Sequence, residues 1–583
     1  MTQASTAAPA CLQKDYVKGG SFLLDAARPE DVFTPEDFTP DQLLYAKTAR
    51  QFMEAEVIPV SDAIEAKDLE LSRRLIRMAG ELGLLMGDVP EAYGGLGLDK
   101  PSCALIAESV SGQGSFQTMA MAHTGIGTLP IVYYGTEAHK QKYLPGLADG
   151  SLIGAYALTE PSSGSDALSA RTKAVLSADG SHFVLNGTKQ FITNAGFADV
   201  FTVFAKIDGD KFTGFVVERG TPGLKIGPEE HKLGIRGSTT TTVILEDALV
   251  PAENVLGEIG KGHKIAFNIL NIGRFKLGMG AVGGAKRALE AALAYTLERK
   301  QFGRRLADFG AIREKLAEMY VRIYAAESMA YRTAGLIEQL LGANADRYEE
   351  AGLQAIEEYS IECAMVKVHC SEALDFVVDE TVQCLGGYGF CAEYPAERYY
   401  RDSRINRIYE GTNEVNRLLV PTMLLRKAAS GELELAGSAP EASGGHLAAE
   451  QHIVANLKRI ALSVLCFAGA KYGKAIAGEQ AILLRLADLV TLAFTAESAL
   501  LRARKEVDRR GEAGAALPVA AARAACEAAI DRAESLARRC LVAMGAEDGL
   551  AELCRLTARR PADVLAVQAG IAAKLVELER VVL

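Results

Sequence analysis

The sequence lacks a basic excess, cysteine pairs and metal-ligand spacings, and each absence argues against one class of protein. Its 583 residues carry 63 Lys and Arg against 74 Asp and Glu, for a net charge of -11. A general nucleic-acid surface needs clustered Lys and Arg, so we expect no nucleic-acid partner. The ten cysteines form no C-x-x-C pair and are typical of reduced thiols. The eight histidines show no H-E-x-x-H spacing, so we predict no metal.

Targeting and membrane-spanning patterns are also missing. The first residues, "MTQASTAAPACLQKDY", lack a basic segment followed by an apolar core, and they lack an Arg-rich transit pattern. Near the C-terminus the longest charge-free apolar stretch is Ile460–Ala470, far short of the roughly 20 residues that span a bilayer. We therefore expect a cytoplasmic protein that is at most peripheral at a membrane.

The sequence that remains is typical of a globular protein with several domains, because 49% of its residues are hydrophobic and 23% are charged. Helical periodicity, strand periodicity and then helical periodicity again follow one another along the chain. We predict an α+β, mainly α, fold. Its parts are an arm (1–38), a helical domain (39–150), an antiparallel β-domain (151–258), a helical bundle (259–427), an Ala/Gly/Ser/Pro-rich linker (428–446) and a C-terminal helical domain (447–583).

Turn residues punctuate the β-domain. Asn186-Gly187 predicts a type I′ hairpin, and Asp208-Gly209 marks a second turn. Because ligand sites favour domain interfaces, we expect a site where the β-domain meets the helical bundle.

Four short motifs could contact a ligand. "YALTEPSSGSD" (156–166) ends a predicted strand and offers backbone N–H groups and small hydroxyls, although a surface turn is the simpler interpretation. "KQFITN" (189–194) sets Phe191 and Thr193 on one face, where they could flank a flavin ring or belong to the core. In "ERKQFG" (298–303), Arg299 could hold a phosphate or be solvated. "QCLGGYGF" (383–390) permits close backbone approach, but no G-x-G-x-x-G motif is present.

A fifth stretch, "RIYEGTNEVNRLLV" (407–420), sets Glu410 just ahead of a predicted helix. Thr412 is typical of an N-cap for a helix beginning at Asn413, and Pro421 should kink or end that helix. Glu410 is then either a catalytic base or only a carboxylate near a helix start.

Taken together and in order, these motifs resemble the acyl-CoA dehydrogenase family over roughly residues 39–427. The matching segments are "ALTEPSSGSD", "LNGTKQFITNAG", "ERKQFG", "QCLGGYGF", "RYYRDSRI" and "IYEGTNEVNRL". The region after 447 is similar to the extension of the very-long-chain branch. The resemblance implies the acyl-CoA dehydrogenase fold, which has an N-terminal helical domain, a middle antiparallel β-domain and a four-helix bundle, here with an extra C-terminal helical domain.

The resemblance also implies an activity: FAD-dependent removal of two hydrogens from a saturated acyl-CoA to give a trans-2-enoyl-CoA, as in fatty acid β-oxidation. The electrons would pass to an electron-transfer flavoprotein. Glu410 would abstract the α-proton, with its pKa raised by burial. Its backbone N–H would polarise the thioester oxygen, and Gly411 would allow the close approach.

Further roles follow from the matching positions. The FAD-binding set would be Leu158, Thr159, Ser165, Phe191, Thr193, Arg299, Gln301, Phe302, Gln383, Gly387, Thr412 and Glu414, with Arg299, Gln301 and Phe302 reaching the FAD of a neighbouring subunit. The substrate-binding set would be Ser165, Asn271, Arg274, Tyr409 and Gly411.

Two positions depart from the family pattern. Phe191 stands where the family usually has Trp, which changes the flavin-facing ring. Gly273 stands where some branches carry the base, one residue before Arg274, and this leaves Glu410 as the candidate. Small residues at Thr118, Ala122 and Gly125 favour medium-to-long straight acyl chains.

Alternatives stay open at this stage. An acyl-CoA oxidase would use the same base but pass electrons to oxygen, and some extended family members serve as non-enzymatic assembly factors. For the C-terminal domain we favour helices that pack on a homodimer. The alternative is that the amphipathic stretch 452–475, with Lys458, Arg459, Lys471 and Lys474, rests on a membrane surface.

Overall fold

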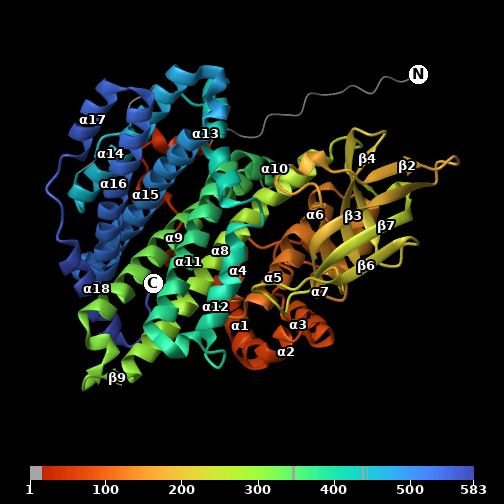
Figure 1. The fold of residues 1–583 in the computed structure, drawn as a ribbon, viewed down its shortest axis with the longest axis horizontal. Helices are drawn as coiled ribbons and strands as arrows, with labels where there is room; N and C mark the ends of the chain where they lie inside the picture. The colour runs from red at the N-terminus through yellow and green to blue at the C-terminus, as the bar shows by residue number, and fades with distance from the viewer. Residues whose placement is uncertain (1–15, 345–347, 436–438, 443) are drawn as a thin grey trace.

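Three long helices form the centre of the molecule, with a sheet on one side and the C-terminal helices on the other (Figure 1). The computed structural model describes residues 16–344, 348–435, 439–442 and 444–583. The central helices are α8 (Gly262–Glu298), α9 (Gly310–Gly342) and α11 (Ser360–Leu385). Helix α10 (Tyr348–Glu358) lies between α9 and α11, and α12 (Pro395–Ser403) and α13 (Asn413–Ala429) follow α11. The predicted α+β, mainly α, fold with an extra helical domain is confirmed.

The N-terminal helices begin where the sequence offers caps. Helix α1 (Pro40–Phe52) starts after Thr39, whose hydroxyl accepts from the Gln42 backbone N–H while the Gln42 side chain accepts from the Thr39 N–H. Two short helices follow further along, α4 (Lys100–Ser109) and α5 (Gly114–Ala122), and Gly112 between them has φ +118°. The others are α2 (Ser61–Glu65), α3 (Leu69–Glu81), α6 (Leu129–Tyr134) and α7 (Glu137–Asp149).

The sheet runs in the order β6-β7-β3-β2-β4-β5-β8, with β1 beside β4. The strands are β1 (Gly154–Ala157), β2 (Lys173–Leu176), β3 (His182–Thr193), β4 (Val200–Ile207), β5 (Lys211–Glu218), β6 (Leu224–Glu229), β7 (Thr240–Pro251) and β8 (Val255–Leu256). The sheet is mixed rather than purely antiparallel as predicted, because β4 pairs in parallel with both β1 and β2. Long connections separate these strands, as parallel neighbours require.

The hairpin predicted at Asn186-Gly187 is wrong. Strand β3 continues through both residues, and a register shift against β7 between Leu185 and Gly187 absorbs them. The Asn186 side chain is bound to β7, where it donates to Asp247 Oδ1 at 3.0 Å and accepts from the Asp247 N–H at 2.9 Å. Pairing along the whole of β7 therefore outweighs the local turn preference. The second predicted turn, at Asp208-Gly209, does join β4 to β5.

Five helices make up the C-terminal domain: α14 (Ala448–Tyr472), α15 (Gln480–Gly514), α16 (Ala516–Met544), α17 (Glu547–Thr557) and α18 (Val564–Leu578). The segment Ala448–Gly478 is long and apolar enough to cross a membrane, but 61% of its apolar window is buried inside the fold. Lys458, one of the basic residues offered for membrane contact, instead points inward and donates to the Asp25 carbonyl at 3.0 Å. Packing within the protein thus accounts for the apolar composition of α14.

Buried ion pairs fasten this domain to the centre. Arg502 of α15 is fully buried and pairs with Glu327 of α9 and Glu36 of the N-terminal arm, each at 2.7 Å. Lys286 of α8 pairs in turn with Glu327 and with Glu108 of α4. Buried charges are tolerated only when paired, so this network fixes the relative position of five segments distant in sequence.

Candidate functional site

The backbone turns sharply just before α13 and brings Glu410 toward α8. Glu410 has φ +56° and Gly411 has φ +76°, two successive left-handed residues. Thr412 then caps the helix as predicted, because its hydroxyl accepts from the Val415 N–H at 3.2 Å. Pro421 does not end α13, which runs on to Ala429. A left-handed conformation at a non-glycine residue is strained and persists where the surroundings impose it, often at a functional site.

The Glu410 carboxylate lies against Gly273 of α8. A Cβ atom at position 273 would lie 2.5 Å from Glu410 Oε2, so only glycine leaves room for the carboxylate in this position. Oε2 is shielded from solvent and has no hydrogen-bond partner. The backbone, in contrast, is held, since Arg274 Nε and Asn416 Nδ2 each donate to the Glu410 carbonyl at 3.3 Å.

Burial raises the pKa of Glu410 to about 7, although the nearby cations Arg274 and Lys367 oppose the rise. A carboxylate with this pKa is a far stronger base than an exposed one and is still ionised in part of the population at neutral pH. The arrangement is therefore suited to taking a proton from a weakly acidic carbon.

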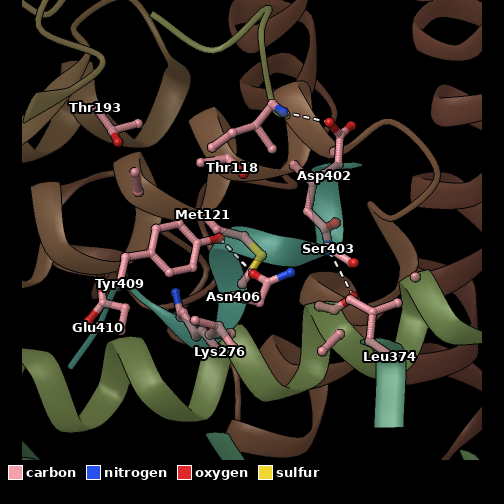
Figure 2. A pocket seen from close by; sticks show the side chains of 18 of the residues that line it. Thr118, Met121, Thr193, Lys276, Leu374, Asp402, Ser403, Asn406, Tyr409 and Glu410 are labelled. Atoms are coloured by element: carbon pink, nitrogen blue, oxygen red, sulfur yellow. Dashed lines mark hydrogen bonds between the residues drawn. The ribbon is translucent and has the colours of Figure 1, made fainter. Parts of the chain in front are cut away.

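Glu410 borders a cavity of about 120 Å³ between α5, α8 and α11 (Figure 2). The wall on α8 contains the small residues Gly273, Gly280, Ala281 and Gly284 at helical spacing, so part of it is helix backbone, with Lys276, Leu277 and Arg287 completing it. The opposite walls are mainly apolar. They include Thr118, Met121, Ala122, Leu374, Val378 and Tyr399. Such a lining fits a hydrocarbon chain rather than a polar ligand.

The cavity wall differs in part from the prediction. Thr118 and Ala122 line it as expected, whereas Gly125 is not among its lining residues. The predictions missed Gln117 and Met121 of α5, whose side chains lie within 3.0 Å of a Cβ built at Gly280. The repeated glycines of α8 were the available sequence pattern for this wall.

A second acidic residue also lines the cavity and was not predicted. Asp402 is buried, and its Oδ1 accepts from the Ile235 N–H while Oδ2 has no partner. Burial, followed by the nearby Glu65 charge, raises the pKa of Asp402 to about 7. Two carboxyl groups, Glu410 and Asp402, are therefore available to a ligand in this space.

The predicted flavin-facing residues gather at one edge of the sheet. Leu158, directly after β1, is buried, and Thr159 is half-buried, while Ser165 is exposed on the following turn. Thr193 lines the same cavity as Glu410. Phe191 does not belong to the core: 61% of its surface is exposed, and its φ is +59°. An exposed aromatic ring two residues before Thr193, which lines the cavity, fits a planar cofactor ring.

Other predicted FAD residues lie elsewhere in the chain. Arg299, Gln301 and Phe302 lie at the hairpin β9 (Lys300–Gln301) and β10 (Arg304–Arg305), which Figure 1 shows at the opposite side from the sheet. The Phe302 side chain is 94% exposed. Gln383 and Gly387 are exposed at the end of α11, and Thr412 and Glu414 begin α13. One chain therefore does not bring the whole predicted set together.

The predicted substrate residues divide into two kinds. Tyr409 lines the cavity and donates from its hydroxyl to Asn406 Oδ1 at 2.8 Å. Asn271 and Arg274 are buried on α8, where Arg274 Nη1 donates to Asn271 Oδ1 at 2.7 Å. In this structure Arg274 contacts the backbone of the segment that carries Glu410. Among the described residues, no cluster of three His, Cys, Asp or Glu side chains could hold a metal ion.

Comparison with known proteins adds independent findings. Family models described as the acyl-CoA dehydrogenase N-terminal, middle and C-terminal domains match residues 39–151, 155–248 and 260–425, and a further C-terminal domain model of that name matches 456–557. A "Probable acyl-CoA dehydrogenase" of Bacillus subtilis is 50% identical over 97% of this chain and 98% of its own. Human mitochondrial very long-chain specific acyl-CoA dehydrogenase is 41% identical over 65% of this chain and 56% of its own.

A similar structure has also been solved. The crystal structure of an acyl-CoA dehydrogenase complexed with FAD from Bacillus anthracis superposes with a TM-score of 0.95. It is 50% identical to this chain and covers 97% of it, and all of that chain is matched. The agreement extends through the C-terminal domain, which the shorter butyryl-CoA dehydrogenase of Megasphaera elsdenii, with 67% of this chain covered and a TM-score of 0.61, does not reach.

Proposed function

The chain belongs to the acyl-CoA dehydrogenase family and is an FAD-dependent oxidoreductase, and from that premise we propose that Glu410 is its catalytic base. The reaction would convert a saturated acyl-CoA into a trans-2-enoyl-CoA. Glu410 would take the α-proton on its carboxylate, so that one C–H bond breaks and one O–H bond forms. FAD, when bound, supplies the acceptor for the hydride that leaves the β-carbon.

The observation that carries this proposal is the free Glu410 carboxylate oxygen beside an apolar cavity. Packing against Gly273 fixes where the carboxylate lies, and burial brings its pKa to about 7. A proton next to a thioester is only weakly acidic, so the base must be both desolvated and positioned. Exclusion of water by the cavity walls would also protect the reacting carbons.

The residues present fit FAD. Phe191 and Thr193 would lie along the flavin ring, and the backbone near Leu158 and Thr159 would meet its polar edge. The exposed position of the β9–β10 hairpin supports the proposal that Arg299, Gln301 and Phe302 bind the cofactor of a second subunit, as in a homodimer. An arginine there would pair with phosphate oxygens.

The cavity supports a medium-to-long straight acyl chain as substrate. Small side chains on α8 leave room along the middle of its wall, between Lys276 and Arg287, and Gln117 and Met121 narrow the space across from Gly280. We further propose an electron-transfer flavoprotein as electron acceptor, as the family pattern implies. Release of hydrogen peroxide in step with turnover would favour the oxidase alternative instead.

The test compares Glu410→Gln with Asp402→Asn in purified holoenzyme. We expect Glu410→Gln to keep the absorbance of bound FAD and to lose anaerobic flavin bleaching by acyl-CoA, tested with chains of several lengths. Asp402→Asn should still bleach, because its Oδ1 already accepts from a backbone N–H. Bleaching by Glu410→Gln at the wild-type rate would show that the base lies elsewhere.

A further inference from the structure

A buried lysine lies next to the proposed base and has no part in the mechanism described above. Lys367 of α11 has no exposed surface. Its Nζ donates to the Gly411 carbonyl at 2.8 Å and to Asn413 Oδ1 at 2.6 Å, on either side of Thr412. These two bonds anchor the turn immediately after Glu410, the turn whose left-handed backbone directs the carboxylate.

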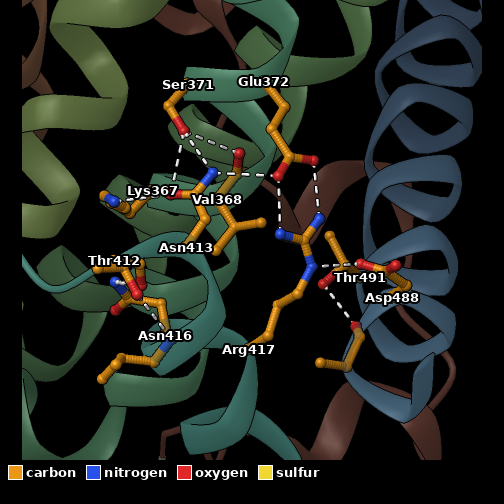
Figure 3. Close-up of polar contacts among 12 residues, drawn as sticks. Lys367, Val368, Ser371, Glu372, Thr412, Asn413, Asn416, Arg417, Asp488 and Thr491 are labelled. Atoms are coloured by element: carbon orange, nitrogen blue, oxygen red, sulfur yellow. Dashed lines mark hydrogen bonds and ion pairs between the residues drawn. The ribbon is translucent and has the colours of Figure 1, made fainter. Parts of the chain in front are cut away.

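The contacts continue outward from Asn413 (Figure 3). Asn413 Nδ2 donates to Glu372 Oε1 at 3.1 Å. Arg417 Nη1 and Nη2 donate to the two Glu372 carboxylate oxygens at 2.7 and 2.8 Å. Arg417 Nε then donates to Asp488 Oδ1 of α15 at 2.7 Å. Asp488 belongs to the C-terminal domain. An unbroken line of hydrogen bonds thus joins that domain to the peptide next to the base.

The charges along this line make it resistant to rearrangement. Burial alone would raise the pKa of Glu372, but the bidentate contact with Arg417 and the hydrogen bond from Asn413 together lower it. Burial lowers the pKa of Lys367 to about 7, and the Glu410 charge opposes this. A buried amine that lost its two acceptors would be left unsatisfied, so Lys367 has a strong preference for one position of the turn.

We propose that Lys367 is a positioning residue for Glu410, and that Asp488 of the C-terminal domain fixes it through Arg417, Glu372 and Asn413. The inference rests on the proposed role of Glu410. It assigns the C-terminal domain a part in the chemistry beyond packing: docking of α15 orders the loop that presents the base.

The first test is Lys367→Met, which keeps the apolar stem and removes both hydrogen bonds. The rate of anaerobic flavin reduction should fall by about 10- to 100-fold, the effect of a displaced catalytic group. The rise of that rate with pH should also move to higher pH, because a cation near the carboxylate is lost. The other groups facing Glu410 are Arg274 of α8, Tyr156 of β1 and the adjacent Tyr409, and they remain in place.

The second test changes Asp488, at the far end of the line of hydrogen bonds from Glu410, and leaves the residues beside Glu410 unchanged. Asp488→Ala should slow flavin reduction by about two- to thirtyfold, with a smaller change in the acyl-CoA concentration for half-maximal rate. The matched control is Arg509→Ala on the same helix, which breaks a different contact between domains, with Asp37 and the Glu36 carbonyl. Arg509→Ala should reduce its flavin at the wild-type rate.

The outcomes separate the two proposals. If Glu410→Gln still reduces its flavin, the proposed base is wrong. If Glu410→Gln is inactive while Lys367→Met matches the wild type in rate and pH profile, only the positioning role fails. If Asp488→Ala and Arg509→Ala behave alike, the C-terminal domain does not act through this line of contacts. Retained FAD absorbance and an unchanged melting temperature identify variants that are correctly folded.

Discussion

Substitution of Gly273 by alanine should separate stability from catalysis. In a helix interior, glycine is less stable than alanine by about 0.5–1 kcal/mol, so Gly273→Ala by itself favours folding. The new Cβ, however, would lie 2.5 Å from Glu410 Oε2 and 2.9 Å from its Cδ. The atom that must move is the end of a flexible side chain, and its displacement costs the fold little.

The Cβ contacts at position 273 also give the size of the shift of the Glu410 carboxylate. Ordinary van der Waals contact begins at 3.4 Å, so the carboxylate oxygen must retreat by about 0.9 Å. A shift of about 1 Å in a reacting group can cost roughly 100-fold in rate. We therefore expect Gly273→Ala to be at least as stable as the wild type and to reduce its flavin about 10- to 100-fold more slowly.

The assay is stopped-flow reduction of bound FAD by acyl-CoA without oxygen, alongside chemical denaturation. Gly570→Ala is the matched control, because Gly570 lies in helix α18 and its added Cβ would meet nothing within 4 Å apart from the adjoining residues and backbone of its own helix. It should share the gain in stability and keep the wild-type rate. A wild-type rate in Gly273→Ala would refute the reasoning, since the carboxylate would then act from a place other than the one observed.

Other perturbations give independent tests. Glu410→Gly should abolish flavin reduction, and adding Gly273→Glu should restore part of it, because position 273 points at the same space; spectroscopic bleaching checks this. Burial raises the folded-state pKa of Glu410 from 4.5 to about 7, so the folded apoprotein binds this proton more tightly than the unfolded chain does. Protonation of Glu410 should therefore stabilise the fold fully below pH 4.5, and this stabilisation should be lost as the pH rises through about 7. Denaturation at several pH values measures it. The flavin-reduction rate should rise over the upper part of the same pH range. Met121→Gly should shift the kcat/KM preference toward longer acyl chains, measured across a chain-length series. Arg502→Ala should destabilise the fold by about 3–5 kcal/mol in denaturant titrations, because Glu327 would be left buried without this partner.

Local patterns predicted much of this molecule. The change from helical to strand periodicity and back predicts the N-terminal helices, the sheet and the central helices in that order, and Thr412 is predicted as a cap from its place before a helix. These features depend on residues within one or two turns of each other. The same local reasoning failed at Asn186-Gly187, where pairing with β7, including the Asn186–Asp247 hydrogen bonds, overrides the turn preference.

The contacts within the site could not be predicted from local sequence, because they join segments that only the fold brings together. Glu410 could be singled out by its motif, but its contact with Gly273 joins residues 137 positions apart and has no local pattern. Lys367 would be interpreted from the sequence as one lysine of an amphipathic helix, whose charged head normally reaches water. Only the packing of α11 against the turn before α13 buries it and gives it its two acceptors. The roles of Asp402 and Asp488 likewise depend on contacts between distant segments.

The ion pair between Glu36 and the buried Arg502 has a consequence for synthesis of the chain. The two residues are 466 positions apart, and they join the N-terminal arm to the C-terminal domain. A ribosome adds about 5–20 residues per second, so Glu36 emerges roughly 20–90 s before its partner. During that interval the arm can still bond to the central helices, as the Gly19 and Gly20 N–H groups do to Glu358 and Glu362, but it cannot pair with α15. The interface between α15 and the central helices therefore forms late in synthesis. The face of those helices that α15 covers stays uncovered until the C-terminal domain has been made.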